Sequence, residues 1–278
     1  MKNVIKSVLA SSLFITTLNA QESNFTEKEL TVFAGPAWGK IKNFNLDKDK
    51  YASVENSTGV NAGLNYSKYF NKNFGINFGI EFNQFKNTAT YKGTYVSEER
   101  SVDRDGYFYY ATAVVDYKDI RIINLIDIPL NLRMQVPVSP SIQFFVDAGL
   151  KLNLALNSKF KQNGTHESKG TYPHAVYSNV SYVIEDDVYY GFKETTYNLD
   201  QDLEANRANY SFCVGGGIKA KLNDKTFILI NPSYMLGLNN VMSKNGSKEY
   251  KNIFNEKTAS DPFKLSQFVL KFGVGFNL

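Results

Sequence analysis

Eight stretches of this 278-residue chain alternate apolar and polar side chains with a period of two, and this alternation constrains the fold more than any other feature. The stretches are residues 29–40, 59–70, 74–85, 120–136, 142–156, 210–222, 226–238 and 264–278. A period of two is typical of a β-strand whose two faces meet different surroundings. Each stretch exceeds the roughly 9 to 11 residues that a tilted strand needs to cross a bilayer. The pattern predicts an all-β protein.

The connections between these stretches alternate in length. Residues 71–73, 137–141 and 223–225 are short links of turn-forming residues, whereas the other links run to about 18, 34, 53 and 25 residues. Short turns at one rim and long polar loops at the other are typical of outer-membrane barrels. We therefore expect an eight-stranded antiparallel up-and-down transmembrane β-barrel with short periplasmic turns and long extracellular loops, some of which continue as hairpins above the membrane.

The polar face of the expected strands carries charges of both signs. These are Glu81, Asp127, Arg133, Asp147, Lys151, Lys219, Lys221 and Lys271. The interior of an eight-stranded barrel is filled by its own side chains, so we expect these charges to pair across the lumen while the apolar face contacts lipid. The rival is a soluble, lipocalin-like barrel with its apolar side inward.

The last stretch supports the membrane interpretation. Its even positions from Phe268 to Leu278 are apolar, whereas Lys271, Gly273, Gly275 and Asn277 suit a crowded polar lumen. We expect this strand to pair with the first one, at residues 30–38, because pairing closes the barrel and removes both exposed edges.

Several residues interrupt the simple pattern. Pro36, Pro129 and Pro232 fall inside expected strands, where each removes a hydrogen-bond donor, and they predict bulges or local strand breaks. In the stretch 226–238, Phe227 and Leu229 are out of phase with later apolar residues, which predicts an irregular strand.

Aromatic residues near strand ends suit the interfacial girdles of a membrane barrel, where a ring with a polar tip is favoured. The candidates are Trp38, Tyr66, Tyr69, Tyr210 and Tyr234.

The first 20 residues predict a cleaved secretory signal peptide, with Lys2 and Lys6 before a short apolar core and Ala20 at the cut. The expected domains are thus 1–20, the signal peptide, and 21–278, the barrel. Loss of the two lysines leaves 29 basic and 27 acidic side chains, a net charge of +2 that gives no nucleic-acid signature. Cys213 is the single cysteine, so no internal disulfide is expected.

The segment Ile126-Asp-Ile-Pro-Leu-Asn-Leu-Arg133 resembles a strand of the PorT-type outer-membrane β-barrel family of Bacteroidota. An Ala-Gln signal end, Gly35, the run at residues 59–64 and the ending Gly-x-Gly-Phe-Asn are similar too. The resemblance implies an eight-stranded outer-membrane barrel with both ends periplasmic, and it makes Pro129 an expected residue. The founding member belongs to a secretion apparatus, but resemblance does not transfer that role. No catalytic motif comes with the family.

Candidate chemistry gathers in the longest link. His166, His174, Ser168, Ser178 and residues 185–187 lie there, but their spacing matches no catalytic motif, and the acidic run lacks the spaced ligands of a calcium loop. We interpret them as solvated loop residues.

Two further features have structural interpretations. The glycines 215–217 look like a phosphate loop without its lysine or helix, and they are better explained by crowding in a small barrel. Cys213 is expected as a free thiol on the polar face. We expect no catalytic, cofactor-binding or metal-binding residue and no cofactor.

These observations favour a non-enzymatic outer-membrane barrel of a Gram-negative bacterium, with surface loops that bind a ligand or an accessory role in an envelope or secretion complex. The alternative is an outer-membrane lipid hydrolase, acyltransferase or protease with a loop-based site; a pore is a third possibility, disfavoured by a filled lumen. Expected partners are outer-membrane lipid or lipopolysaccharide, the barrel-insertion machinery and an envelope or secretion-complex protein, but no nucleic acid.

Overall fold

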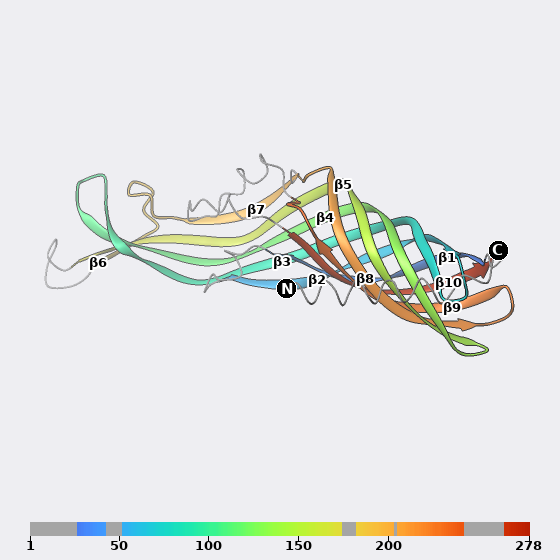
Figure 1. The fold of residues 1–278 in the computed structure, drawn as a ribbon. Coiled ribbons are helices and arrows are strands. Elements are labelled where there is room, and N and C mark those ends of the chain that lie inside the picture. Colours follow the sequence, from blue (N-terminus) through green and yellow to red (C-terminus); the bar gives the residue numbers. More distant parts are fainter. Residues whose placement is uncertain (1–26, 43–51, 174–181, 203–204, 242–263) are drawn as a thin grey trace, which may run out of the picture.

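The computed structural model describes residues 27–42, 52–173, 182–202, 205–241 and 264–278, and in these segments the regular structure is all β (Figure 1). The strands are β1 Lys28–Lys42, β2 Ala52–Tyr69, β3 Phe74–Val102, β4 Phe108–Ser139, β5 Ile142–Tyr172, β6 Tyr182–Glu185, β7 Glu194–Asp202, β8 Ala208–Lys221, β9 Thr226–Gly237 and β10 Lys264–Asn277. Within the described segments no helix is long and apolar enough to cross a membrane.

Eight of these strands form a closed antiparallel ring. β1 pairs with β2 and the order continues through β3, β4, β5, β8 and β9 to β10, which pairs back with β1. At the closure Leu30 lies opposite Phe276 and Trp38 opposite Phe268. The eight-stranded barrel and the pairing of its last strand with its first are therefore confirmed.

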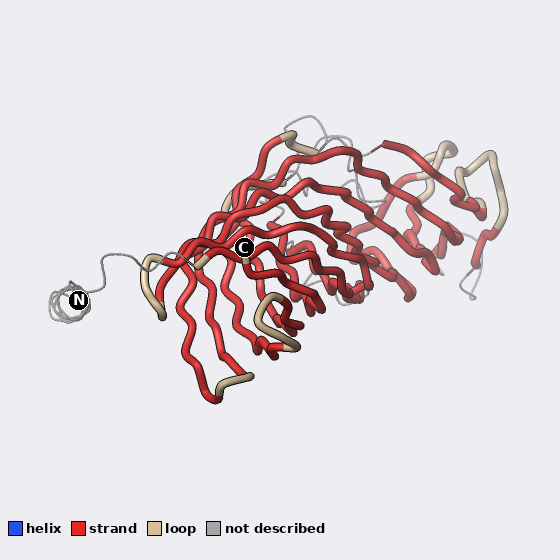
Figure 2. The backbone as a smooth tube through the Cα atoms, turned by 90° about the vertical axis from the view of Figure 1, so that its right-hand side faces the viewer, coloured by secondary structure: helices blue, strands red, loops and turns tan. Residues whose placement is uncertain are grey.

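The two ends of the ring differ. Residues 71–73, 140–141 and 222–225 form short turns at one rim, which we call the turn end. Both β1 and β10 reach this rim, where the Leu278 amide donates to the Lys28 carbonyl at 2.9 Å. The opposite rim, the loop end, is where β3, β4 and β5 run on (Figures 1 and 2).

The apolar face of the strands points outward. Leu132 on β4 is 71% exposed and Phe272 on β10 is 48% exposed, while Arg133 and Lys271, one position along, are buried inside. On β4 the outward positions from Ile126 to Val136 are all apolar. Eleven residues of a strand tilted by about 45° cover roughly 25 Å, the height of the apolar band of a membrane barrel. Lipid outside and a polar lumen inside account for this arrangement, and a lipocalin-like core does not.

Three strands extend well beyond the barrel. β3, β4 and β5 contain 29, 32 and 31 residues, against 14 in β10. At about 3.3 Å per residue, β4 is roughly 100 Å long. Its upper part forms, with the neighbouring strands, a curved sheet of residues 86–122, 158–173 and 182–202, which we call the projecting sheet (Figure 1). The strands expected to end at residues 85 and 156 and to begin at residue 120 are too short, because all three continue past these residues, where most outward side chains are polar.

Residues of the longest expected link also join the projecting sheet. β7 pairs with β5 from Lys159 to Glu167, and β6 pairs with it from Lys169 to Tyr172. Figure 2 shows strands continuing the barrel wall away from the ring, and Figure 1 labels β6 and β7 in this extended part. The prediction that long loops continue as hairpins above the barrel is confirmed.

Of the bulges or local strand breaks predicted at the prolines, the structure shows only local breaks in pairing. Pairing lapses for two residues of β1 at Pro36 in its ladder with β10, and similar gaps occur beside Pro129 and Pro232, but no bulge forms, because the register is unchanged across all three. The missing proline donor is tolerated because each strand stays paired on its other side. A register shift occurs instead between Asn124 and Leu125 of β4, opposite β5.

The predicted irregularity of β9 is wrong. Phe227 and Leu229 are buried in the lumen in the same phase as Asn231 and Met235. The strand is regular, and the chemistry of the lumen changes along it: near the turn end, Phe227 and Leu229 pack with Phe145 of β5 in an apolar cluster.

Glycine on the inner face makes room for close packing. A Cβ on Gly217 would lie 2.1 Å from the Ile230 carbonyl oxygen and 2.8 Å from the Phe145 ring. A side chain at Gly215 would come within 2.9 Å of Ser233. The interpretation as relief of crowding is therefore confirmed for Gly215 and Gly217, whereas Gly216 faces outward and a Cβ there would come no closer than 3.1 Å to any atom.

Two residues lie elsewhere than expected. Tyr69, a girdle candidate, is fully buried in the lumen, whereas Trp38, Tyr66, Tyr210 and Tyr234 lie on the outer face. Lys221, expected inside, is exposed at the turn end because the strand reaches the rim there. The other seven charged residues expected on the polar face are buried in the lumen.

Candidate functional site: a sealed lumen and a projecting tip

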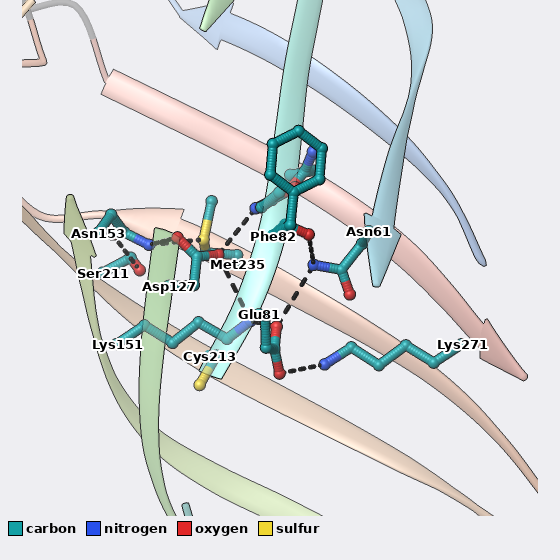
Figure 3. A network of polar contacts seen from close by, with 12 residues as sticks. Asn61, Glu81, Phe82, Asp127, Lys151, Asn153, Ser211, Cys213, Met235 and Lys271 are labelled. Atoms are coloured by element: carbon teal, nitrogen blue, oxygen red, sulfur yellow. Dashed lines mark hydrogen bonds and ion pairs between the residues drawn. The ribbon is translucent and has the colours of Figure 1, made fainter. Parts of the chain in front are cut away.

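The middle of the lumen is crossed by an ion-pair network centred on Glu81 of β3 (Figure 3). Its two carboxylate oxygens each accept a hydrogen bond of 2.7 Å, one from Lys151 of β5 and one from Lys271 of β10. Asp127 of β4 lies 3.8 Å from the Lys151 ammonium and accepts hydrogen bonds from Asn83 and Asn153. These side chains come from four different strands, so the network ties opposite walls together.

A second network lies nearer the turn end. The Lys219 ammonium donates to both oxygens of Glu29, at 2.7 and 2.6 Å, and also to the Tyr69 hydroxyl. Arg133 forms a bidentate pair with Asp147, with both N···O distances 2.7 Å. Bidentate geometry is the strongest form of such a pair. Taken together, the two networks contain four acidic and four basic side chains, so the buried charge is balanced.

Apolar side chains close the lumen beyond these networks. At the loop end the buried cluster consists of Phe85, Ile123, Leu125, Phe160, Met235, Val241 and Leu265. Between the two networks lies a cavity of about 20 Å³, lined in part by Asn65, Asn77 and Lys151, which is room for about one water molecule. In the described part of the chain, side chains therefore fill the lumen, and it does not form an open channel.

The far end of the projecting sheet, which we call the tip (residues 100–110, 170–173 and 182–192), has an aromatic cluster on one face. Tyr109 of β4 packs on Tyr172 of β5 at 5.6 Å and edge-on against Phe192 at 5.1 Å. Phe192 is 3% exposed and its ring covers Gly170, where a Cβ would lie 2.2 Å from it. The segment that links β6 to β7 is thereby folded over this face.

Hydrogen bonds fix the two tip turns to each other. Asp103 accepts from the amides of Asp105 and Tyr107, at 2.9 and 2.8 Å, and from the Tyr172 hydroxyl at 2.9 Å. Asp105 accepts from the hydroxyl of Tyr190 at 2.8 Å. An aspartate that satisfies turn amides stabilises the turn locally, and here it also anchors the neighbouring strands.

The opposite face of the tip exposes apolar side chains. Val102 of β3 is 55% exposed, Phe108 of β4 is 51% exposed and Val183 of β6 is 46% exposed, and Val96 of β3, just below the tip, is 59% exposed. Val102 lies opposite Phe108, and Val183 lies opposite Thr171 of β5. We call these four side chains the tip face. On β3 and β5 they are separated from the apolar band of the barrel by a long stretch of polar residues on the outer face, such as Thr90 and Thr165.

The residues considered for catalysis are not assembled into a triad in the described part of the chain. Ser168 exchanges hydrogen bonds with backbone groups of Gly191 and Lys193, and Glu185 pairs with Lys169 at 2.8 Å. His166 lies on β5 opposite Val115, and burial lowers its pKa from the ordinary value. His174 and Ser178 lie outside the described residues.

The acidic run is part of a turn. Asp186 has a positive φ of 51°, and Asp187 accepts a hydrogen bond from the Tyr189 amide at 2.9 Å. Among the described residues no group of three histidine, cysteine or acidic side chains could hold a metal ion. Cys213 is a free, buried thiol on the inner face of β8, and its sulfur lies 3.0 Å from the Asn131 side-chain oxygen.

Sequence reasoning missed several residues of the lumen and the tip. Glu29 and Tyr69 occupy inward positions, two residues from the inward Thr31 and Ser67. The alternation of the strands, followed to their ends, would therefore have placed both inside. The tip had a weaker signal, because the density of tyrosine in residues 107–110 and 189–192 does not reveal that the two segments meet.

Solved structures of membrane barrels are similar to this chain at low sequence identity. Neisserial surface protein A has 9% identity and a TM-score of 0.43, with 91% of this chain and 99% of that chain covered. Ail, the attachment invasion locus protein of Yersinia pestis, has 12% identity in its complex with a heparin analogue, a TM-score of 0.32 and coverage of 92% and 100%. The outer membrane protease OmpT from Escherichia coli has 7% identity, a TM-score of 0.33 and coverage of 91% and 96%.

No curated protein matches the sequence. The scores of the solved structures carry no argument about function. A family model described as "Outer membrane protein beta-barrel domain" does match, over residues 19–243. With the closed eight-stranded ring and its outward apolar band, this match means that the chain belongs to the outer membrane protein beta-barrel domain family and is an outer-membrane protein.

Proposed function

We propose that this protein is a non-enzymatic surface-binding protein, in which the barrel is the membrane anchor and the tip face is the contact surface for a protein partner at the cell surface. The observation that carries the proposal is the exposure of Val96, Val102, Phe108 and Val183 on the projecting sheet, far from the lipid band. Isolated exposed apolar residues need no explanation, but a group on one face of a projecting element is typical of an interaction site.

The construction of the tip favours binding. Its other face is packed by Tyr109, Tyr172 and Phe192, and Asp103 and Asp105 hold its turns. A surface that is ordered before binding loses little conformational entropy when the partner arrives. The apolar side chains of the tip face, three of which are valines without a polar group, suit a protein surface better than a sugar.

The lumen supports the role of an anchor. Its ion pairs join opposite walls, and apolar clusters close it at both ends. A pore would need an open path through the same space. The alternative, an enzyme with a loop-based site, has weaker support because Ser168 and Glu185 are engaged in other contacts.

Photo-crosslinking on living cells tests the proposal. A photoreactive phenylalanine analogue at position 108 is expected to give an adduct with a protein, and Val102→Ser with Val183→Ser is expected to reduce its yield several-fold. The matched control places the analogue at Val188, which is 74% exposed but lies on the β6–β7 segment. Equal yields at positions 108 and 188, or adducts unaffected by the serine substitutions, would contradict a binding role for the tip face.

Three narrower assignments are also proposed. Residues 1–20 are a cleaved signal peptide; they lie outside the described residues, and N-terminal sequencing of the mature protein tests the cut. The segment 126–133 and the ending of β10 support membership of the PorT-type family of Bacteroidota. The aromatic outer face of β10 supports recognition by the barrel-insertion machinery, and loss of assembly in cells after Phe276→Ser would agree with it.

A further inference from the structure

A row of side-chain amides on β3, β4 and β5 marks the upper limit of the lipid-facing surface on β3 and β5. Gln84 donates to Asn124 at 3.2 Å, and Asn124 donates to Asn157 at 2.6 Å. Directly below this row the outward positions are Phe82, Ile126 and the leucines of β5. On β3 and β5 the apolar band therefore ends here, whereas β4 continues it with the outward Ile122 and Ile120. The side chains immediately above the row lie at the level of the lipid headgroups.

Lysines follow this row on the same outer face. Lys86 of β3 and Lys159 of β5 occupy the next outward-facing position of their strands toward the loop end, and both lie opposite Ile122 of β4. Lys118 lies four residues before Ile122 on β4. Among the described residues, no carboxylate forms an ion pair with any of these three lysines, in contrast to Lys161, which pairs with Asp200 at 2.8 Å.

Two of the acidic residues near the three lysines lie on the flanking strands, and a third, Asp116, lies on β4 itself, two residues before Lys118. Asp202 of β7 is opposite Lys159, and Glu55 of β2 is opposite Thr88. Asp116 is held by Lys92 at 3.2 Å. We call the three side chains Lys86, Lys118 and Lys159 the lysine patch. It lies over β3, β4 and β5 and carries their positive charge.

The spacing of the lysine patch suits a ligand with more than one phosphate. Strands two apart in a sheet are separated by roughly 10 Å, and four residues along a strand span roughly 13 Å. Flexible lysine side chains can cover these distances and converge on anionic oxygens. A molecule that meets both the patch and the apolar surface directly below it must have an anionic head and apolar chains.

We propose that Lys86, Lys118 and Lys159 bind the phosphate groups of a phosphorylated glycolipid of the outer leaflet. The lipid chains lie along the outward side chains of Phe82 and Ile126, and the amide row of Gln84, Asn124 and Asn157 contacts the sugar region. This inference requires only the barrel in the membrane, so it stands or falls independently of the tip face.

Native mass spectrometry of the full mature protein in an uncharged detergent tests the inference. The probes are lipid A with two phosphates, the same lipid with its phosphates removed, and inorganic phosphate. We expect the phosphorylated lipid to bind, and the triple variant K86Q/K118Q/K159Q to bind it about 10-fold to 100-fold more weakly, since each lysine near an anionic surface contributes about 1 kcal/mol.

The matched control is K68Q/K221Q/K225Q, which removes the same charge from exposed lysines at the turn end. It is expected to bind the phosphorylated lipid like the original protein. Heat-modifiable gel mobility shows that each variant is folded, and single substitutions replace the triple variant if it is not. Equal binding by the two triple variants, equal binding of both lipids, or inorganic phosphate bound as tightly as the lipid would each overturn the assignment.

Discussion

Lys151 and Lys161 lie ten residues apart on β5, and each forms one short ion pair, yet their surroundings differ completely. The Lys151–Glu81 pair measures 2.7 Å in the lumen, where the two side chains are 6% and 1% exposed. The Lys161–Asp200 pair measures 2.8 Å on the projecting sheet, where they are 41% and 53% exposed. Distance alone therefore does not indicate what an ion pair contributes.

The difference between the two regions is one of solvation. In the lumen, water cannot solvate a charged side chain that has lost its ion-pair partner, so removal of one partner strongly destabilises the protein. On the projecting sheet water and salt screen the charges, and a single pair contributes little. The lumen is thus held by its polar networks, whereas the tip is held by turn hydrogen bonds and aromatic packing.

The largest expected effect is on the lumen. Glu81→Gln leaves Lys151 and Lys271 without their shared carboxylate and should lower the free energy of unfolding by about 3–5 kcal/mol. Urea unfolding in detergent micelles measures it. Asp200→Asn, which breaks the exposed pair of Lys161, is the control and should change stability by less than about 1 kcal/mol. Similar losses for both variants would contradict the contrast between the two regions.

Packing of the inner wall gives the next effect. Gly217→Ala places a Cβ 2.1 Å from the Ile230 carbonyl oxygen, so the backbone must shift, and we expect a cost of about 1–3 kcal/mol. The neighbour Gly216 faces outward, and its added Cβ would come no closer than 3.1 Å to any atom, so Gly216→Ala should cost less. The same unfolding assay compares the two, and an equal cost would show that crowding inside the barrel is not the cause.

A local effect is expected at the tip. Asp103→Ala removes the acceptor for two turn amides and for the Tyr172 hydroxyl, which should destabilise the tip by about 1–2 kcal/mol. Hydrogen exchange of residues 100–110 should become faster while exchange in β8 and β9 stays unchanged. Faster exchange throughout the barrel would mean that the two regions unfold together.

The smallest effect concerns pH. Burial lowers the pKa of His166 on the projecting sheet, so the folded sheet favours the neutral imidazole. The unfolded state then binds more protons, and stability falls as the pH drops below the ordinary pKa of histidine, near 6.5. Hydrogen exchange of β5 residues 160–170 should therefore accelerate slightly between pH 7 and pH 5. His166→Gln should remove this acceleration; if it persists unchanged, another group is responsible.

Much of the barrel could be predicted from the chain because alternation reports directly on the two environments of a strand wall. The eight strand cores, the short turns, the closing pair of β1 and β10, and seven of the eight lumen charges follow from it. At Pro36, Pro129 and Pro232 the pairing lapses on one side but no bulge forms. The missing donor predicts the lapse, whereas the neighbouring strand on the other side, which keeps each strand in register, cannot be seen from the local sequence.

The projecting sheet was harder to predict because no lipid contacts its outer face. There polar residues such as Thr88, Thr90 and Lys92 occupy the outward positions, so the contrast with the buried inner positions Ala89 and Tyr91 is weak in the sequence although the strand continues. The sequence shows that two long links are rich in tyrosine. It does not predict the contact between Tyr109 and Phe192, because these residues are 83 positions apart in the chain.

By itself, the sequence determined which residues face lipid and which face the lumen, since transfer of an apolar or a charged side chain between these environments changes the free energy strongly at each position. Only the tertiary structure decided which charges meet, because Glu81 is shared by Lys151 and Lys271 from strands that neither pair with β3 nor lie near it in the chain. The same holds for the tip face and the lysine patch. Both are assembled across strands by the register of the sheet, which hydrogen bonding along whole strands fixes and no short stretch of sequence encodes.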